Sequence, residues 1–173
     1  MNALDVLVDA FGRVASDVHR ALDGLGPDEL ALRLDPDANP ISWLVWHLTR
    51  VQDDHVADLA GTAQVYTADG WAERFALPLD DAGIGFGHSR ADVDAVRVDS
   101  VELLLGYYDA VHDRTVTYLR TLTDDDLDAV VDDAWDPPVS RGVRLISVVD
   151  DDIQHAGQAA YVAGLARRRG GRR

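Results

Sequence analysis

The sequence contains no cysteine, and this absence excludes several kinds of site. Without thiolates the chain can form no cysteine-ligated zinc site, no disulfide framework and no protein thiol nucleophile. Any bound metal must therefore be held by histidine and carboxylate side chains. With 173 residues the chain is long enough to bury a core without disulfides, so we expect a single domain.

Lysine is also absent, and all 16 basic residues are arginines. Five of these lie in residues 167–173, which leaves eleven arginines against 31 acidic residues in residues 1–166 and a formal charge of −20 there. A body of this charge repels nucleic acid and anionic membranes, so neither is an expected partner. The final RRRGGRR is typical of a solvated, disordered basic tail, and we place the end of the domain at residue 166.

Long apolar runs are missing as well. The first residues, MNALDVLVDAFG, include Asp5 and Asp9 and form no basic leader. No apolar run approaches the length that spans a bilayer. We therefore expect a cytoplasmic protein that has no membrane partner.

Apolar residues at helical spacing dominate four long segments of the chain. These segments are residues 2–23, 40–61, 100–122 and 144–164. Shorter helices are expected at residues 71–75, at residues 89–97 and after a cap at Thr123. Because no segment alternates as a strand does, the predicted fold class is all-α, a four-helix bundle with a long crossover between the second and third helices. The crossover, residues 62–99, is long enough to suggest a functional lid.

The fourth segment, RLISVVDDDIQHAGQAAYVAG, places an acid and an imidazole together. Asp151 and His155 are four residues apart, so their side chains rise from one helical face about one turn apart. The opposite face is also apolar or small, which predicts a helix buried on two sides. An acid and a histidine at this spacing can bind one divalent ion if another helix supplies a third ligand. Three consecutive aspartates, 150–152, would turn one carboxylate toward packed surface in any case, so a structural role stays open.

The second segment offers two histidines for the third ligand. His55 lies near the middle of the apolar stripe, so periodicity favours it as the inward-facing imidazole. His47 lies at the margin of the stripe and shares its edge with Asp54 and Asp58. Helical spacing therefore leaves the choice between His47 and His55 open. Two imidazoles and one carboxylate would leave positions free on the ion, as in catalytic zinc and non-haem iron sites.

These motifs carry a family resemblance. WHLTRVQDDHV in the second segment and VVDDDIQHAGQAAYV in the fourth, preceded by WDPPV, resemble the DinB-like superfamily of bacterial four-helix proteins, and more closely its actinobacterial branch. The resemblance extends over nearly the whole chain. It implies a divalent metal bound by His47, Asp151 and His155, the last of these followed by Gly157-Gln158.

At the position of Asp151 many members of the superfamily carry histidine. The mycothiol-dependent maleylpyruvate isomerases, which are related through the same helical domain, carry a carboxylate there, so the resemblance implies that a metal is still bound. An aspartate is a harder ligand than an imidazole. We expect zinc, with nickel, iron and manganese as alternatives.

The resemblance also implies a reaction class. A metal-dependent transferase or isomerase would use a low-molecular-weight thiol such as mycothiol as co-substrate, and the ion would lower the pKa of that thiol. A metal-dependent hydrolase would need a neighbouring base, for which Asp54 and His55 are the candidates. The alternative class is a stress-associated binding protein without turnover, with a structural metal or a pocket for a small molecule.

For the remaining candidate residues the sequence allows two interpretations, a role in binding or a role in packing and ion pairing. Small residues in the fourth segment would let a second copy pack there as a homodimer, or let one bundle pack tightly; these are Ala156, Ala160 and Gly164. Arg50 and Arg144 would bind an anionic substrate or pair with carboxylates. His88 is expected to be an exposed loop residue. The remaining aromatic candidates line a pocket or pack in the core: Trp43, Trp46, Tyr107, Tyr108 and His112.

Overall fold

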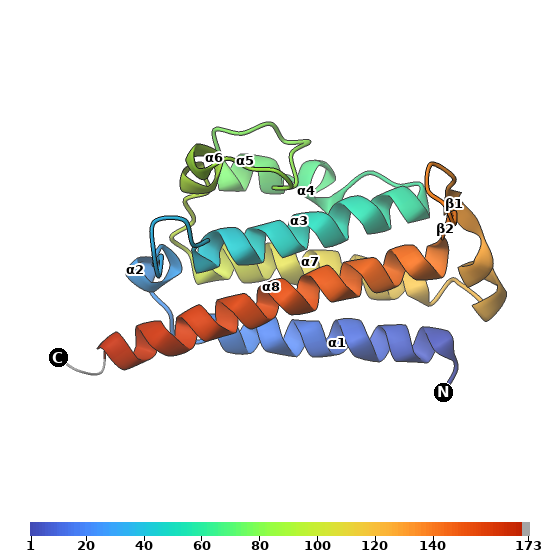
Figure 1. The fold of residues 1–173 in the computed structure, drawn as a ribbon, viewed down its shortest axis with the longest axis horizontal. Coiled ribbons are helices and arrows are strands. Elements are labelled where there is room, and N and C mark those ends of the chain that lie inside the picture. Colours follow the sequence, from blue (N-terminus) through green and yellow to red (C-terminus); the bar gives the residue numbers. More distant parts are fainter. Residues whose placement is uncertain (171–173) are drawn as a thin grey trace.

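A computed structural model describes residues 1–170, and four long helices form its bundle (Figure 1). The helices are α1 (Ala3–Leu22), α3 (Ile41–Ala60), α7 (Val101–Leu119) and α8 (Arg141–Gly170). Both α8 and α7 pack against α1 and α3. Because the chain crosses back along the bundle after α3, α3 and α7 run in the same direction (Figure 1). The predicted all-α fold class is confirmed.

Local side chains explain where these helices begin and end. Asn2 caps α1 in a reciprocal capping box with Asp5, and Ser100 caps α7 by accepting a hydrogen bond from the backbone of Leu103. Gly61 ends α3 with φ +64°, a conformation that glycine adopts without strain. The predicted ends of α1 and α3 each lie within one residue of the observed ends.

The last helix, α8, is longer than predicted. Residues 167–170, which we predicted to be a disordered tail, are helical, and residues 171–173 lie outside the described part of the chain. The Arg167 guanidinium stabilises this end because it donates hydrogen bonds to three carbonyl oxygens at the end of α1, those of Arg20, Ala21 and Asp23. Arginines in a last turn also interact favourably with the helix dipole.

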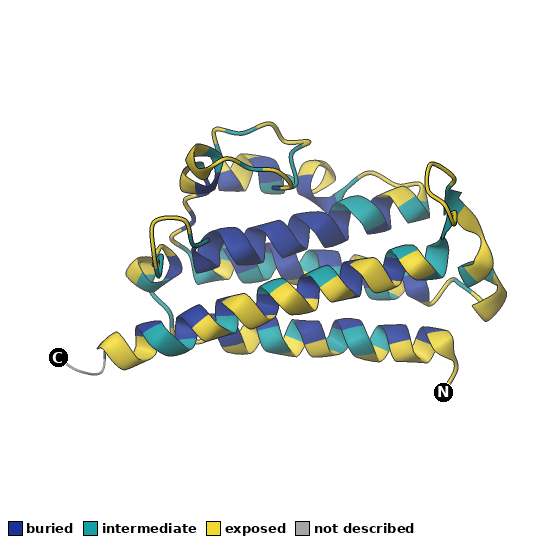
Figure 2. Cartoon of the chain, viewed as in Figure 1, coloured by how far each residue is buried: buried dark blue, intermediate teal, exposed yellow. Residues whose placement is uncertain are grey.

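The prediction that α8 is buried on two sides is wrong. Ile146 and Ile153, on the face opposite the metal-ligand candidates, are 55% and 49% exposed. The two long helices that contact α8, α1 and α3, lie on its other side. Figure 2 shows exposed residues along the length of α8. Ala156, by contrast, is buried inside the bundle, so this small residue serves packing within one chain.

The connection between α3 and α7 covers the outer side of α3. It contains the short helices α4 (Val65–Ala68), α5 (Trp71–Phe75) and α6 (Arg90–Ala95), of which α5 and α6 were predicted. The first part of α3, Ile41–Asp53, is therefore buried throughout, polar residues such as Arg50 and Gln52 included. Figure 2 shows this part of α3 as buried and the end of the helix as partly exposed. Because a helix that is covered all round has a weak amphipathic pattern, periodicity is a poor guide to which side chains of α3 face inward.

Four smaller elements complete the fold. They are α2 (Pro27–Leu30), the 3₁₀ helix η1 (Asp124–Asp128) and an antiparallel pair of strands, β1 (Val130–Asp132) and β2 (Val139–Ser140). The helix η1 follows the predicted Thr123 cap. The strand pair was not predicted, because strands of two or three residues are too short to show alternation. Within residues 1–170, no helix combines the length and apolar character needed to cross a membrane.

The core between the long helices contains a carboxyl group that has no hydrogen-bond partner in the described part of the chain. Phe11, Leu48, Leu104 and Val148 are buried there, and so is Asp152, which is 0% exposed. Neither carboxyl oxygen of Asp152 has a hydrogen-bond partner among the described residues. Burial raises the pKa of Asp152 well above its usual range, because an ionised carboxylate is poorly solvated in this core.

Candidate metal centre

His47 lies on the covered side of α3 and is 6% exposed. Its Nδ1 lies 2.5 Å from the carbonyl oxygen of Ile84 in the long connection. Because a carbonyl oxygen only accepts, Nδ1 donates this hydrogen bond, and Nε2 keeps its lone pair for a metal. Trp43, one turn earlier on α3, stacks on the imidazole with ring centroids 4.5 Å apart. The orientation and the tautomer of His47 are thus determined by protein contacts.

Glycine at position 85 makes this close approach possible. Gly85 has φ +98°, and a Cβ placed on it would lie 2.5 Å from Nδ1 of His47. Side chains other than hydrogen would therefore be strained and would collide with the imidazole. The connection can bring the Ile84 carbonyl to His47 because its next residue is glycine.

Arg50 anchors the same part of the connection. Its side chain is 0% exposed, and it donates hydrogen bonds to the carbonyl oxygens of Asp81 at 2.7 Å and Gly83 at 3.3 Å. The guanidinium also lies 4.1 Å from the centre of the Tyr66 ring and 3.7 Å from Asp53. Arg50 therefore pairs with a carboxylate and holds the long connection in place. Of its two predicted roles, substrate binding and pairing with a carboxylate, the structure shows the second.

Asp151 and His155 lie one turn apart on α8, as predicted, and their side chains meet His47. His155 Nε2 is 3.7 Å from Asp151 Oδ1, and the ring centroids of His155 and His47 are 4.8 Å apart. His155 Nδ1 lies 3.0 Å from Oε1 of Gln158, to which it donates, so Nε2 of His155 is also available to a metal. Asp151 Oδ2 is buried and has no hydrogen-bond partner within residues 1–170.

These three side chains fit a divalent ion. One donor atom from each of His47, Asp151 and His155 lies within 4.8 Å of the other two. Two ligand atoms at about 2.1 Å from a tetrahedral ion are about 3.4 Å apart, so small side-chain movements would close the cluster around a metal. Burial lowers the pKa of His47, which keeps the imidazole neutral as a ligand must be. Two imidazoles and a carboxylate suit zinc and leave coordination positions free.

His55, which periodicity favours, is not part of this cluster. It lies about two turns beyond His47 on α3, with its side chain 29% exposed and Nδ1 3.9 Å from Oδ2 of Asp54. Burial and the positive charge of Arg144 lower the pKa of His55, so the imidazole is neutral at pH 7 and able to accept a proton. Asp54 accepts a hydrogen bond from Gln64 at 2.7 Å. His47 is the more deeply buried histidine because the connection covers it.

Two side chains beside the site, those of His88 and Gln158, have contacts that the sequence analysis did not predict. His88, expected to be exposed, is half-buried: its Nδ1 accepts a hydrogen bond from Trp43 Nε1 at 3.2 Å, and its ring stacks on Trp46 at 5.8 Å. The sequence does indicate that Gln158 lies near His155, because a residue three positions later on a helix is a neighbour on the same face. Helical spacing does not show which polar neighbour of a ligand forms a hydrogen bond with it, so the contact between Gln158 and His155 was not predicted.

The other predicted candidates have structural roles. Tyr107 and Tyr108 are 0% exposed in the core, and His112 stacks on Tyr108. Arg144 forms an ion pair with Asp132 at 2.9 Å, at the start of α8. Neither tyrosine lines the metal-ligand cluster formed by the two histidines and the aspartate.

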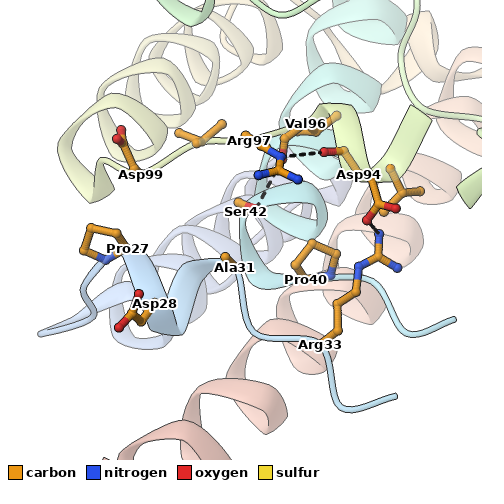
Figure 3. A pocket seen from close by; sticks show the side chains of 12 residues that line it. Pro27, Asp28, Ala31, Arg33, Pro40, Ser42, Asp94, Val96, Arg97 and Asp99 are labelled. Carbon is orange, nitrogen blue, oxygen red and sulfur yellow. Dashed lines mark hydrogen bonds and ion pairs between the residues drawn. The ribbon is translucent and has the colours of Figure 1, made fainter. Parts of the chain in front are cut away.

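A cavity of about 550 Å³ lies beside the start of α3, between α2 and residues 93–99 (Figure 3). Its walls include the ion pair of Arg33 with Asp94, at 2.7 Å, and the buried hydroxyl of Ser42. None of the three candidate ligands lines this cavity. The cavity and the metal-ligand cluster are therefore separate features of the molecule.

Fold and site together define an all-α protein in which a four-helix bundle brings two histidines and a carboxylate to one point. The family model of the DinB superfamily matches residues 10–159, and the chain belongs to this superfamily. It is similar to a solved structure, that of a conserved protein from Enterococcus faecalis, with 29% identity and a TM-score of 0.88 over 94% of this chain and 96% of that one. A comparison with curated proteins gives no match. The predicted resemblance is confirmed at the level of the superfamily.

Proposed function

We propose that His47, Asp151 and His155 bind a divalent metal ion, with zinc as the first expectation, and that the ion activates a low-molecular-weight thiol for a transfer or isomerisation reaction. The observation that carries the proposal is the convergence of three donor atoms within 4.8 Å, in which both imidazoles are already fixed through Nδ1. Membership of a superfamily whose members often bind metal supports the first half. The carboxylate at position 151, shared with the mycothiol-dependent isomerases, favours mycothiol as the thiol.

A bound ion lowers the pKa of a thiol and so supplies the nucleophile that a cysteine-free chain lacks. The remaining tasks belong to residues of the chain. Trp43 covers one face of His47 and excludes water from it. His55, neutral and next to Asp54, is available to accept the proton that the thiol releases.

A metal-dependent hydrolase is the second candidate, because the same pair of His55 and Asp54 would serve as a base toward water. A binding protein without turnover is the third. In each case the partner is a small molecule, since the acidic body disfavours nucleic acid and anionic membranes. The three classes differ in what metal loading and turnover measurements would find.

Metal content tests the first half of the proposal. Protein purified without a histidine tag should contain about one divalent ion per chain by elemental analysis. His47→Ala and His155→Ala should lose most of the ion, because each removes one of three ligands. His55→Ala is the matched control on the same helix and should keep it. A wild-type protein without a stoichiometric ion, or an equal loss in His55→Ala, would contradict the ligand assignment.

Turnover tests the second half. Consumption of mycothiol with a panel of electrophiles should depend on the metal, and His55→Ala should slow it while the metal content stays unchanged. Metal-dependent cleavage of ester or amide substrates without thiol consumption would favour the hydrolase. A loaded protein that turns over neither panel would favour the binding protein.

A further inference from the structure

The outer face of α8 exposes large apolar side chains in a line. The exposed fractions are 55% for Ile146, 49% for Ile153 and 65% for Tyr161. In Figure 2, exposed residues recur along this face, and no other described segment crosses in front of them. Single exposed apolar side chains are ordinary on protein surfaces, but a row of them on one helix face is typical of an interface.

The spacing along this line is that of a seam between two helices. Successive members are three or four residues apart, as in helices that pack side by side. We call the line the outer seam; it consists of Ile146, Asp150, Ile153, Gly157, Tyr161, Gly164 and Arg168. Gly157 lies at its centre, and a Cβ placed there would have nothing within 4 Å. The backbone of another helix can therefore approach closely at Gly157.

The charges on the outer seam complement one another in one orientation only. Asp150 precedes Gly157 by seven residues and Gly164 follows it by seven, so two antiparallel α8 helices that cross at Gly157 place Asp150 opposite Gly164 of the second copy. The Arg168 guanidinium lies over Gly164, with Nη1 3.6 Å from the position of a Cβ there. Asp150 of one copy would thus face Arg168 of the other, and a twofold axis repeats the pair. A parallel arrangement would instead bring Asp150 against Asp150.

We propose that a second copy of this chain docks on the outer seam in the antiparallel orientation. Ile153 of each copy packs against Tyr161 of the other, and Asp150 pairs with Arg168. The metal ligands point elsewhere, because His155 and Asp151 lie about 160° and 120° around the helix axis from Gly157. The interface is therefore independent of the metal centre, and either can fail without the other.

Light scattering after size-exclusion chromatography tests the interface. The wild-type chain at about 100 μM should have twice the mass of one chain. Ile153→Glu should be monomeric at the same concentration, because it buries an unpaired carboxylate. Val6→Glu on α1 is the matched control, since Val6 is 50% exposed against 49% for Ile153, and it should stay dimeric. Circular dichroism checks that both variants remain folded.

Charge reversal tests the orientation. Asp150→Arg and Arg168→Asp should each weaken dimerisation about tenfold or more, and the double variant should recover it. In this cysteine-free chain, Asp150→Cys mixed with Gly164→Cys should form a disulfide between copies, whereas Asp150→Cys alone should not. A monomeric wild type, a dimer that survives Ile153→Glu, or a disulfide in Asp150→Cys alone would overturn the proposal.

Discussion

Substitution of Gly85 by alanine should weaken metal binding although residue 85 is not a ligand. The added Cβ would lie 2.5 Å from His47 Nδ1 and 3.2 Å from Cγ of the same ring. Favourable contacts between such atoms begin at about 3.5 Å, so the loop or the imidazole must move by about 1 Å. Such a movement would stretch the 2.5 Å hydrogen bond between Ile84 and Nδ1 to about the limit of a hydrogen bond.

Without this hydrogen bond, the proton of His47 is no longer held on Nδ1, and the orientation of the imidazole is no longer fixed. Removing a group that orients a metal ligand lowers metal affinity about 10- to 100-fold, or about 1.4 to 2.8 kcal/mol. The measurement is a competition titration of the metal-free protein with zinc and a chromophoric chelator. The expected result for Gly85→Ala is a dissociation constant higher by that factor.

Gly87→Ala is the control for backbone strain. Gly87 has φ +72°, and a Cβ there would have nothing within 4 Å, so alanine adds strain without a collision. Gly87→Ala should lose about 1–2 kcal/mol of stability in urea unfolding of the metal-free protein, and Gly85→Ala should lose at least as much, because it adds the collision to the strain. Only Gly85→Ala should also lose metal affinity. If the two variants bind zinc equally well, the contact between the connection and His47 does not control the ligand.

Three further predictions follow from buried or hydrogen-bonded side chains. Gln158→Leu should lower zinc affinity about tenfold in the same titration, because it removes the acceptor for His155 Nδ1 while the exposed site leaves stability nearly unchanged; unaltered affinity would contradict this role. Arg50→Met should lower the free energy of unfolding by about 3 kcal/mol or more, because it leaves the buried Asp53 without its cation; a loss below about 1 kcal/mol would contradict the anchoring role. Burial raises the pKa of Asp152 in the folded state, so the folded chain holds this proton more tightly than the unfolded chain does, and the contribution of Asp152 to stability falls as pH rises above about 4, by at most about 1.4 kcal/mol per pH unit. The stability of metal-free Asp152→Asn relative to wild type should therefore increase between about pH 5 and pH 8 in urea unfolding, and a constant difference would refute the assignment.

Local interactions explain why much of the fold could be predicted. Helical spacing of apolar residues acts within a few residues, and so do caps such as Asn2 at the start of α1 and Gly61 at the end of α3, so the ends of these two helices could be predicted closely. The long connection was predicted from its glycine and proline content. The end of α8 was placed too early because its stabilising contact, from Arg167 to the carbonyl oxygens at the end of α1, joins distant parts of the chain.

The site divides in the same way. That Asp151 and His155 share a helical face follows from a separation of four residues, and the sequence alone determines it. Which histidine of α3 is the third ligand depends on the path of the long connection. Arg50 holds this connection against α3 by hydrogen bonds to residues more than thirty positions away. Because this connection covers the outer side of α3, His47 is buried while His55 stays partly exposed. Helical periodicity describes one helix against one core, and only the tertiary structure decides what covers the opposite face.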